Sequence, residues 1–190
     1  MISSMLMVGP SANAEVLNFD VNSITNGYGG LQWDNFGVIS GTSMPGSGYD
    51  TGTVSGTNTA FNMYGEPASF SSATAFTLND AFFTGAWNNG LQIHVVATGG
   101  SNTYTTDFTV DTYGPTNIFF NWANLNSVSF FTSGGVQNSD LDGAGLHFAM
   151  DNLRINEVIS PVPEPESYAL MLAGLGLIGF MARRRENFSF

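Results

Sequence analysis

The sequence predicts an all-β protein, a two-sheet antiparallel sandwich of jelly-roll type followed by a single C-terminal transmembrane helix. Two observations predict the sandwich. Apolar and polar residues alternate with period two along much of residues 15–159, which is typical of half-buried antiparallel strands. Gly, Asn and Ser turns separate about ten short runs of this kind. A third observation predicts the helix: residues 168–182 carry no charge and are apolar on every helical face.

Residues 1–14 have the pattern of a partial signal peptide. A short apolar stretch ends in Ala12-Asn13-Ala14, an A-x-A cleavage pattern immediately before Glu15. The stretch lacks a basic n-region, so we expect the true start to lie upstream of Met1. These features predict export through the Sec machinery and a mature chain that begins at Glu15.

The strands are expected within one domain, residues 15–159. They are predicted at residues 15–21, 33–40, 57–63, 76–79, 81–87, 91–98, 103–110, 117–122, 127–132 and 147–156. A tight hairpin turn is expected at residues 88–90 and another turn at residues 99–102. Residues 42–55 form the longest irregular stretch, and we expect an exposed loop there. Sixteen phenylalanines and three tryptophans indicate a buried core rather than disorder.

The charge balance narrows the partners. Residues 15–160 contain twelve Asp or Glu against one basic residue, Arg154, and the whole chain has no lysine and no cysteine. Such a surface repels phosphate backbones, so nucleic acid is excluded as a partner. It attracts divalent cations, although solubility alone is an alternative reason for the charge. Without cysteine, disulfides do not stabilise the exported domain.

Asp151 stands in an otherwise apolar strand, where an unpaired carboxylate is costly. The alternation of apolar and polar residues also shifts by one position across Asp151 and Asn152, which predicts a β-bulge there. The sequence leaves its partner open: backbone N–H groups, Arg154 or a metal ion. The strand resembles the closing strand of jelly-roll carbohydrate-binding modules, with Met150 in place of Leu in their Leu-Asp-Asn pattern. That resemblance implies a structural calcium held by Asp151.

In such folds the first and last strands are neighbours. Asp20 or Glu15, at the start of the chain, would then supply further oxygen ligands to the calcium. A second acidic stretch, residues 138–143 (Asn-Ser-Asp-Leu-Asp-Gly), has the first half of an EF-hand-like loop. Its first ligand position is Asn138 and its twelfth is Ala149, so we expect an exposed Asp-Gly turn there instead.

Sequence motifs for catalysis are absent. The two histidines, His94 and His147, lie in strand patterns without a nucleophile or zinc motif beside them. The chain is therefore predicted not to be an enzyme, with a pair of hydrolytic carboxylates as the lesser alternative. Among the aromatic residues, Tyr28, Tyr49 and Tyr113 lie in Gly-rich loops, and we expect them to be exposed and to stack on sugars. Trp87 and Trp122 continue apolar strand faces and are expected to be structural.

The last thirty residues have three parts. Pro163-Glu164-Pro165 is followed by the apolar run 170–181 and then by Arg183, Arg184 and Arg185. This tail resembles the PEP-CTERM sorting signal of Gram-negative bacteria. The resemblance implies a precursor anchored in the inner membrane by the helix, with the arginines in the cytoplasm, and cut by an exosortase near the Pro-Glu-Pro motif. The alternative is an ordinary membrane anchor that is not processed.

The predicted organisation is therefore a partial signal peptide (1–14), a β-sandwich (15–159) and a sorting tail (160–190). Together these parts indicate a non-catalytic exported protein of the cell surface or extracellular matrix that binds or is embedded in exopolysaccharide. The alternatives are a purely structural biofilm-matrix protein without a defined ligand, or a glycan hydrolase.

Overall fold

A computed structural model describes residues 13–158, 171–173 and 175. The chain divides into two units, residues 1–158 and 159–190. The four described residues of the second unit are helical, and the rest of the predicted transmembrane helix lies outside the described residues. In the part of the chain that the structure describes, no helix combines the length and the apolar character needed to cross a bilayer.

The first unit is a β-sandwich with short helices in its connections. Its strands are β1 (Glu15–Leu17), β2 (Gln32–Asp34), β3 (Phe36–Ser40), β4 (Asn58–Asn62), β5 (Ala68–Gly85), β6 (Asn88–Asn89), β7 (Leu91–Gly99), β8 (Asn102–Val110), β9 (Thr116–Ser133), β10 (Val136–Gln137) and β11 (Phe148–Ile155). One α-helix, α1 (Gly48–Thr51), and three 3-10 turns, Tyr28–Gly30, Gly41–Ser43 and Met63–Gly65, lie between them.

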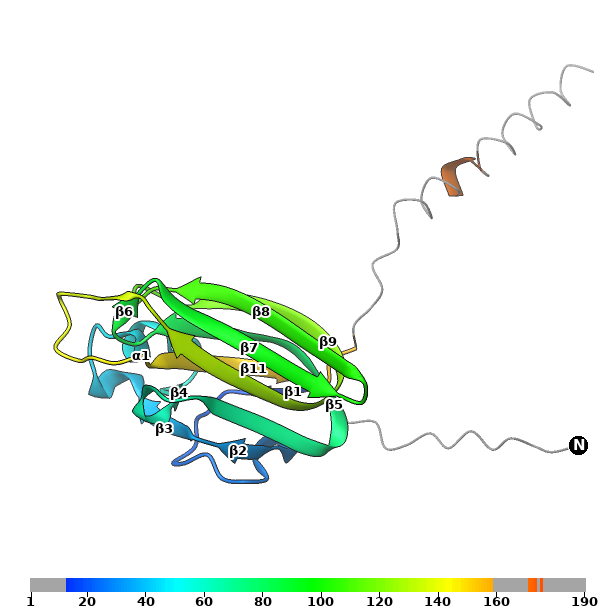
Figure 1. The fold of residues 1–190 in the computed structure, drawn as a ribbon, viewed down its shortest axis with the longest axis horizontal. Helices are drawn as coiled ribbons and strands as arrows, with labels where there is room; N and C mark the ends of the chain where they lie inside the picture. Colours follow the sequence, from blue (N-terminus) through cyan, green and yellow to red (C-terminus); the bar gives the residue numbers. More distant parts are fainter. Residues whose placement is uncertain (1–12, 159–170, 174, 176–190) are drawn as a thin grey trace, which may run out of the picture. The chain divides into compact units, whose positions relative to one another are not determined.

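Two long strands link the layers of the sandwich. β5 and β9 are 18 residues each, and they pair with each other along their lengths with register shifts between Ser71 and Asp80. The first part of β5 and the last part of β9 belong to a layer with β2, β7 and β8. Their other parts lie in a layer with β11, β4 and β3, and β1 pairs with β11 (Figure 1). All pairs are antiparallel, as the predicted two-sheet sandwich of jelly-roll type requires.

Phenylalanine fills the space between the layers. Phe83 of β5 lies with its ring centroid 5.8 Å from Phe130 of β9, 5.7 Å from Phe148 of β11 and 5.1 Å from Phe108 of β8. Phe83, Phe130 and Phe148 are at most 1% exposed. Each fully buried ring contributes roughly 1.5–3 kcal/mol through removal of apolar surface from water. The buried residues of the main core all lie between Leu17 and Ile155, so residues 13–158 contain their own folding core.

The alternation predicted for residues 91–98 is confirmed. Leu91, Ile93, Val95 and Ala97 of β7 are fully buried. The turn after β7 is also confirmed, because Gly99 pairs with Asn102 across a two-residue loop. In that loop Gly100 has φ +57°, a left-handed conformation that glycine adopts without a Cβ penalty.

The hairpin predicted at residues 88–90 is wrong. β5 and β7 are not neighbours, because β7 pairs with β8 and β9 instead. The chain crosses between the two layers here, and Asn88 and Asn89 form β6, which pairs with β10. Gly90 does have the left-handed φ of +66° that the turn prediction relied on. Local turn chemistry was therefore identified correctly, but it does not decide which strands pair.

The exposed loop predicted at residues 42–55 is correct for residues 42–46 and for Val54, and wrong for the buried residues between them. Residues 42–46 are exposed, but Ser47, Gly48 and Tyr49 are buried. The Ser47 side chain caps α1 by accepting a hydrogen bond from the Tyr49 N–H. A Cβ at position 48 would overlap the carbonyl oxygen of Gly85, so glycine allows α1 to lie directly against the end of β5.

Candidate functional site

Asp151 lies in β11 and is fully buried. Its Oδ2 accepts hydrogen bonds from the backbone N–H groups of Val54 (2.7 Å) and Ser55 (3.0 Å), and its Oδ1 accepts one from Asn152 (2.7 Å). Burial raises the pKa of Asp151, and the three N–H groups partly offset that rise. The predicted bulge is confirmed by a register shift between Asp151 and Arg154 and by the φ of +47° at Asn152.

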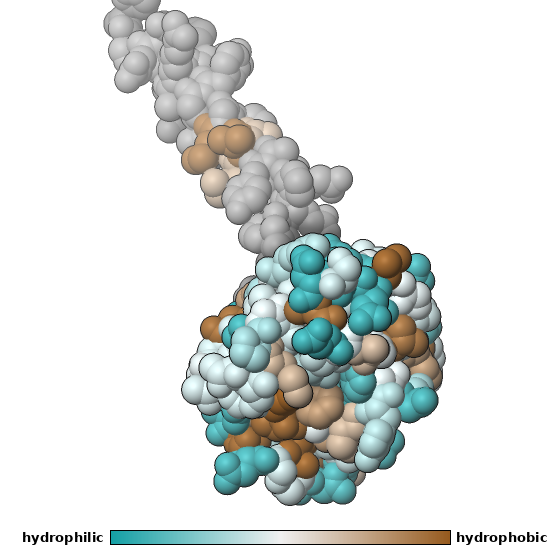
Figure 2. Space-filling view, turned by 90° about the vertical axis from the view of Figure 1, so that its left-hand side faces the viewer, coloured by the Kyte–Doolittle hydropathy of each residue, from teal (hydrophilic) through white to brown (hydrophobic). Residues whose placement is uncertain are grey.

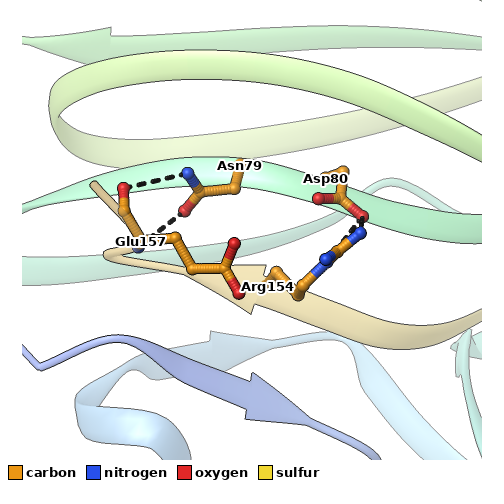
Figure 3. Close-up of polar contacts among 4 residues, drawn as sticks. All are labelled: Asn79, Asp80, Arg154 and Glu157. Carbon is orange, nitrogen blue, oxygen red and sulfur yellow. Dashed lines mark hydrogen bonds and ion pairs between the residues drawn. The ribbon is translucent and has the colours of Figure 1, made fainter. Parts of the chain in front are cut away.

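Arg154 pairs with Asp80 of β5, not with Asp151. Its Nε and Nη2 lie 3.0 Å and 2.9 Å from Oδ1 of Asp80, whose side chain is 5% exposed (Figure 3). Next to this pair, Asn79 donates to the backbone oxygen of Glu157 (3.1 Å) and accepts from its N–H (3.0 Å). These contacts bind the last residues of the sandwich, 154–157, to β5.

Asp20 binds the loop that also binds Asp151. Its Oδ1 accepts hydrogen bonds from the N–H groups of Thr57 (2.8 Å) and Asn58 (3.1 Å). A Cβ at position 56 would overlap the Asp20 carboxylate, so Gly56 leaves room for it. The negative charge of Asp20 adds to the rise in the pKa of Asp151. The sequence prediction that Asp20 comes near the closing strand is therefore correct.

Glu15 does not join these two carboxylates in the way predicted. It is exposed in β1, where it lies opposite Ile155. Within the described residues, no group of three or more His, Cys, Asp or Glu side chains is placed to hold a metal ion. The predicted set of Asp151, Asp20 and Glu15 is not assembled. Calcium held by the two aspartates and other oxygens stays a prediction.

The expectation that Tyr49 is exposed is wrong. Its side chain is 4% exposed, and its ring packs edge-on against Phe61 (5.5 Å) and Trp87 (5.4 Å). Burial raises the pKa of Tyr49 well above its usual value. Tyr49 belongs to a small second core and presents no ring face to a ligand. The sequence could not reveal this, because the burial arises when α1 packs on the ends of β5 and β11.

The other two candidate tyrosines differ from each other. Tyr28 is half-buried: its hydroxyl accepts a hydrogen bond from the Phe19 N–H (3.1 Å) and its ring packs near Trp33, so the expected exposure is wrong. Tyr113 is 73% exposed, as expected, and its hydroxyl accepts a hydrogen bond from the Asn89 side chain (3.0 Å). Of the three, Tyr113 alone offers an open ring face.

Four connections gather at one end of the sandwich: residues 41–47, 86–90, 111–115 and 138–147. We call this the loop end. In Figure 1 it is the end that carries α1 and β6, whereas β1 pairs with the last residues of β11 toward the opposite end. Figure 2 views the loop end and shows apolar residues set among hydrophilic ones.

A pocket of about 400 Å³ opens at the loop end. It is lined by residues 43–45, Trp87 and residues 140–143. Gly143 lies directly against the six-membered ring of Trp87, because a Cβ there would overlap three of its carbon atoms. Trp87 has a second neighbour, Tyr49, whose ring is nearly perpendicular to the indole. The half-buried Trp87, predicted to be structural, therefore packs on the small core and also lines a cavity.

A hydrogen-bond network fixes the loop on which the acidic residues lie. Asn138 is buried; its N–H donates to the Trp87 carbonyl oxygen (2.8 Å) and its side-chain nitrogen donates to Thr112 Oγ1 (2.8 Å). Its side-chain oxygen accepts from the Asp140 N–H (3.1 Å). Thr112 in turn donates to Asn89, which binds Tyr113. Asn138, considered as a metal ligand in the EF-hand comparison, is instead the residue that fixes this loop.

The carboxylates of Asp140 and Asp142 are exposed at the pocket. Among the described residues, neither carboxylate takes part in a hydrogen bond or ion pair of the structure. The one basic residue of the sandwich, Arg154, pairs with Asp80 near the end where the chain leaves. The pocket thus combines apolar walls with uncompensated negative charge. The expected exposed turn at residues 138–143 is confirmed for the acids, but its place beside Trp87 could not be read from the sequence.

The two histidines are apart and outside the pocket lining. His94 Nδ1 lies 2.7 Å from Asp107 Oδ1 on an exposed strand face, and His147 Nδ1 lies 3.0 Å from the Asn62 carbonyl oxygen. Trp122 is half-buried and stacks on Tyr104 at 5.5 Å, as its structural prediction implies.

Residues 161–185 match the family model of the PEP-CTERM protein-sorting motif. The class defined by fold and tail is therefore an antiparallel β-sandwich protein with a sorting signal. More particularly, the chain carries the PEP-CTERM motif, which indicates an exported protein sorted by an exosortase. The predicted resemblance of the tail is confirmed.

Solved structures add two distant likenesses. One is the carbohydrate-binding module TmCBM61 in complex with β-1,4-galactotriose, at 11% identity, covering 73% of this chain and 97% of that one, with a TM-score of 0.38. The other is the agarase AgWH50C, at 7% identity, covering 81% of this chain and 26% of that one, with a TM-score of 0.39. Both TM-scores are below 0.5, so neither likeness bears on what this chain binds. No curated protein matches the sequence.

Proposed function

We propose that this chain is a non-catalytic protein of the cell surface or extracellular matrix, released from the inner membrane of a Gram-negative bacterium by an exosortase and bound to exopolysaccharide. The observation that carries the proposal is the sorting motif at residues 161–185 behind a sandwich with its own core. In this proposal the Sec machinery exports the chain, and the helix holds the precursor until cleavage near Pro163-Glu164-Pro165.

The layout of the sandwich supports display of a binding surface. Residues at the loop end line the pocket. From that end β11 runs toward the other end of the sandwich, where its last residues pair with β1 (Figure 1). Eight extended residues separate the two ends by about 26 Å. Residue 158, the last described residue of the sandwich, therefore follows the end of β11 that is remote from the loop end.

The charge of the sandwich supports polysaccharide over nucleic acid. The chain has a formal net charge of −11 and no lysine. Phosphate polymers are repelled by such a surface, whereas sugar hydroxyls donate hydrogen bonds to carboxylates. The pocket offers apolar surface beside the carboxylates of Asp140 and Asp142, as sites for sugars commonly do. Tyr113 offers a further exposed ring.

Sorting and binding are tested separately. Tagged full-length chain, expressed in a Gram-negative host with an exosortase, should shorten by the mass of its tail and appear at the surface or in the matrix. Residues 13–158 alone should be retarded in native gels that contain matrix polysaccharide. A precursor that stays full-length in the inner membrane contradicts the sorting role. Sorting without retardation in any polysaccharide gel would instead indicate a purely structural matrix protein.

A further inference from the structure

We propose that the loop-end pocket binds a sugar unit with a free amino group, as in a partly de-N-acetylated polysaccharide. This inference rests on the proposed polysaccharide-binding function and specifies its ligand class. It depends on three properties of the pocket: its size, its charge and the rigidity of the loop that carries the charge.

The size and lining suit one sugar unit. A volume of about 400 Å³ lies within the range of small-ligand sites, roughly 300–1,000 Å³. Met44, Pro45 and Leu141 contribute apolar side chains to the lining, and Trp87 adds an aromatic one. Apolar and aromatic walls accept the C–H faces of a pyranose ring.

The charge selects the amino group. Asp140 and Asp142 place two carboxylates at the pocket without a compensating cation among the described residues. An anionic sugar such as a uronate would meet repulsion there. A neutral sugar would gain hydrogen bonds, and an ammonium group would gain charge-assisted ones, which are roughly twice as strong. The pocket therefore favours a protonated amino sugar over its N-acetylated form, in which the charge is absent and the amide is bulkier.

The loop holds these acids in position before a ligand arrives. Asn138 fixes the start of the loop through Trp87 and Thr112, and Gln137 Nε2 donates to the Gly143 carbonyl oxygen (2.7 Å) at its end. Gly143 brings the loop against the indole. A preorganised loop loses little conformational entropy on binding, so the ligand does not have to order it.

Calorimetry of residues 13–158 in EDTA tests the inference. It compares the affinity for a glucosamine oligomer with the affinity for an N-acetylglucosamine oligomer of equal length. The amine form should bind at least tenfold more tightly. That preference should disappear in the Asp140→Asn/Asp142→Asn variant and as the pH rises through the deprotonation of the amine. The matched control is Asp34→Asn/Asp107→Asn, which removes two exposed charges outside the pocket and should keep the preference.

Gly143→Ala provides a second variant, since its methyl group would displace the loop from Trp87 without any change of charge. It should weaken binding of the amine form while the sandwich still melts cooperatively. Equal losses in the two double variants would overturn the inference by showing general attraction to an acidic protein. So would equal affinity for the two oligomers. If the domain is still retarded by polysaccharide in either case, the proposed function stands; if it binds no polysaccharide at all, the proposed function fails.

Discussion

Replacing Asp151 with Asn tests the role of the most deeply buried acid. In the wild type its two oxygens accept three hydrogen bonds, from the backbone N–H groups of Val54, Ser55 and Asn152. An amide has one acceptor oxygen and one donor group in the same volume. If the Asn oxygen replaces Oδ2, it keeps the bonds to Val54 and Ser55, and its NH2 group then faces the N–H of Asn152.

The expected destabilisation follows from that geometry. The variant loses one hydrogen bond to a charged acceptor, about 1.5–3 kcal/mol, and two donors now face each other in the interior. We expect a decrease of about 3 kcal/mol in the free energy of unfolding. For a domain of this size, 1 kcal/mol corresponds to roughly 3–4 °C, so the melting temperature should fall by about 10 °C. Thermal unfolding of residues 13–158 followed by circular dichroism measures it.

The pH dependence provides a second readout. Burial raises the folded-state pKa of Asp151 above the unfolded value near 3.8. At pH values between the unfolded pKa and the raised folded pKa, Asp151 therefore holds more protons in the folded state than in the unfolded state. The stability it contributes is fully present below the unfolded pKa and is lost as the pH rises through the raised folded pKa. The Asn variant should lack this loss.

Two results would contradict this account of Asp151. A variant that melts within about 2 °C of the wild type would show that the hydrogen bond from the Asn152 N–H to Oδ1 contributes little to stability. A wild type that gains stability as the pH rises through the same window would show a lowered pKa, as a bound cation produces. If a calcium ion were bound at Asp151 and Asp20, EDTA would remove it and lower the melting temperature of the wild type. A ligand at a hundred times its dissociation constant adds about 2.7 kcal/mol to the stability of the folded state.

Three further predictions concern sorting, the small core and the buried ion pair. Glu164→Ala should leave export intact and block shortening of the precursor, as seen by immunoblot; a variant that still matures would contradict the sorting role of the motif. Tyr49→Ala should destabilise the sandwich by about 3 kcal/mol or more, because it removes a buried ring. The control Tyr113→Ala should leave the stability nearly unchanged. Equal decreases in melting temperature for the two variants would refute the assignment of Tyr49 to the core. Arg154→Ala should cost about 2–3 kcal/mol in urea unfolding by leaving Asp80 buried without its partner. An unchanged midpoint would show that the ion pair does not stabilise the sandwich.

The sequence by itself determined the features that depend on local pattern. Alternation along residues 91–98 identified β7 and its buried face, because side-chain direction in a strand has period two. The phase slip at Asp151 and Asn152 identified the bulge for the same reason. The sorting tail could be identified because its motif is a contiguous stretch of sequence that does not depend on the fold.

Only the tertiary structure decided which distant segments meet. Asn88 and Gly90 suit a hairpin, but pairing depends on which strands bury their faces together, and β7 pairs with β9 instead. Tyr49 lies in a Gly-rich stretch, yet α1 packs it against Phe61 and Trp87. The pocket joins residues about a hundred positions apart, from Met44 to Gly143. No local pattern encodes such contacts, because they form only when the two layers close and bring the loop end together.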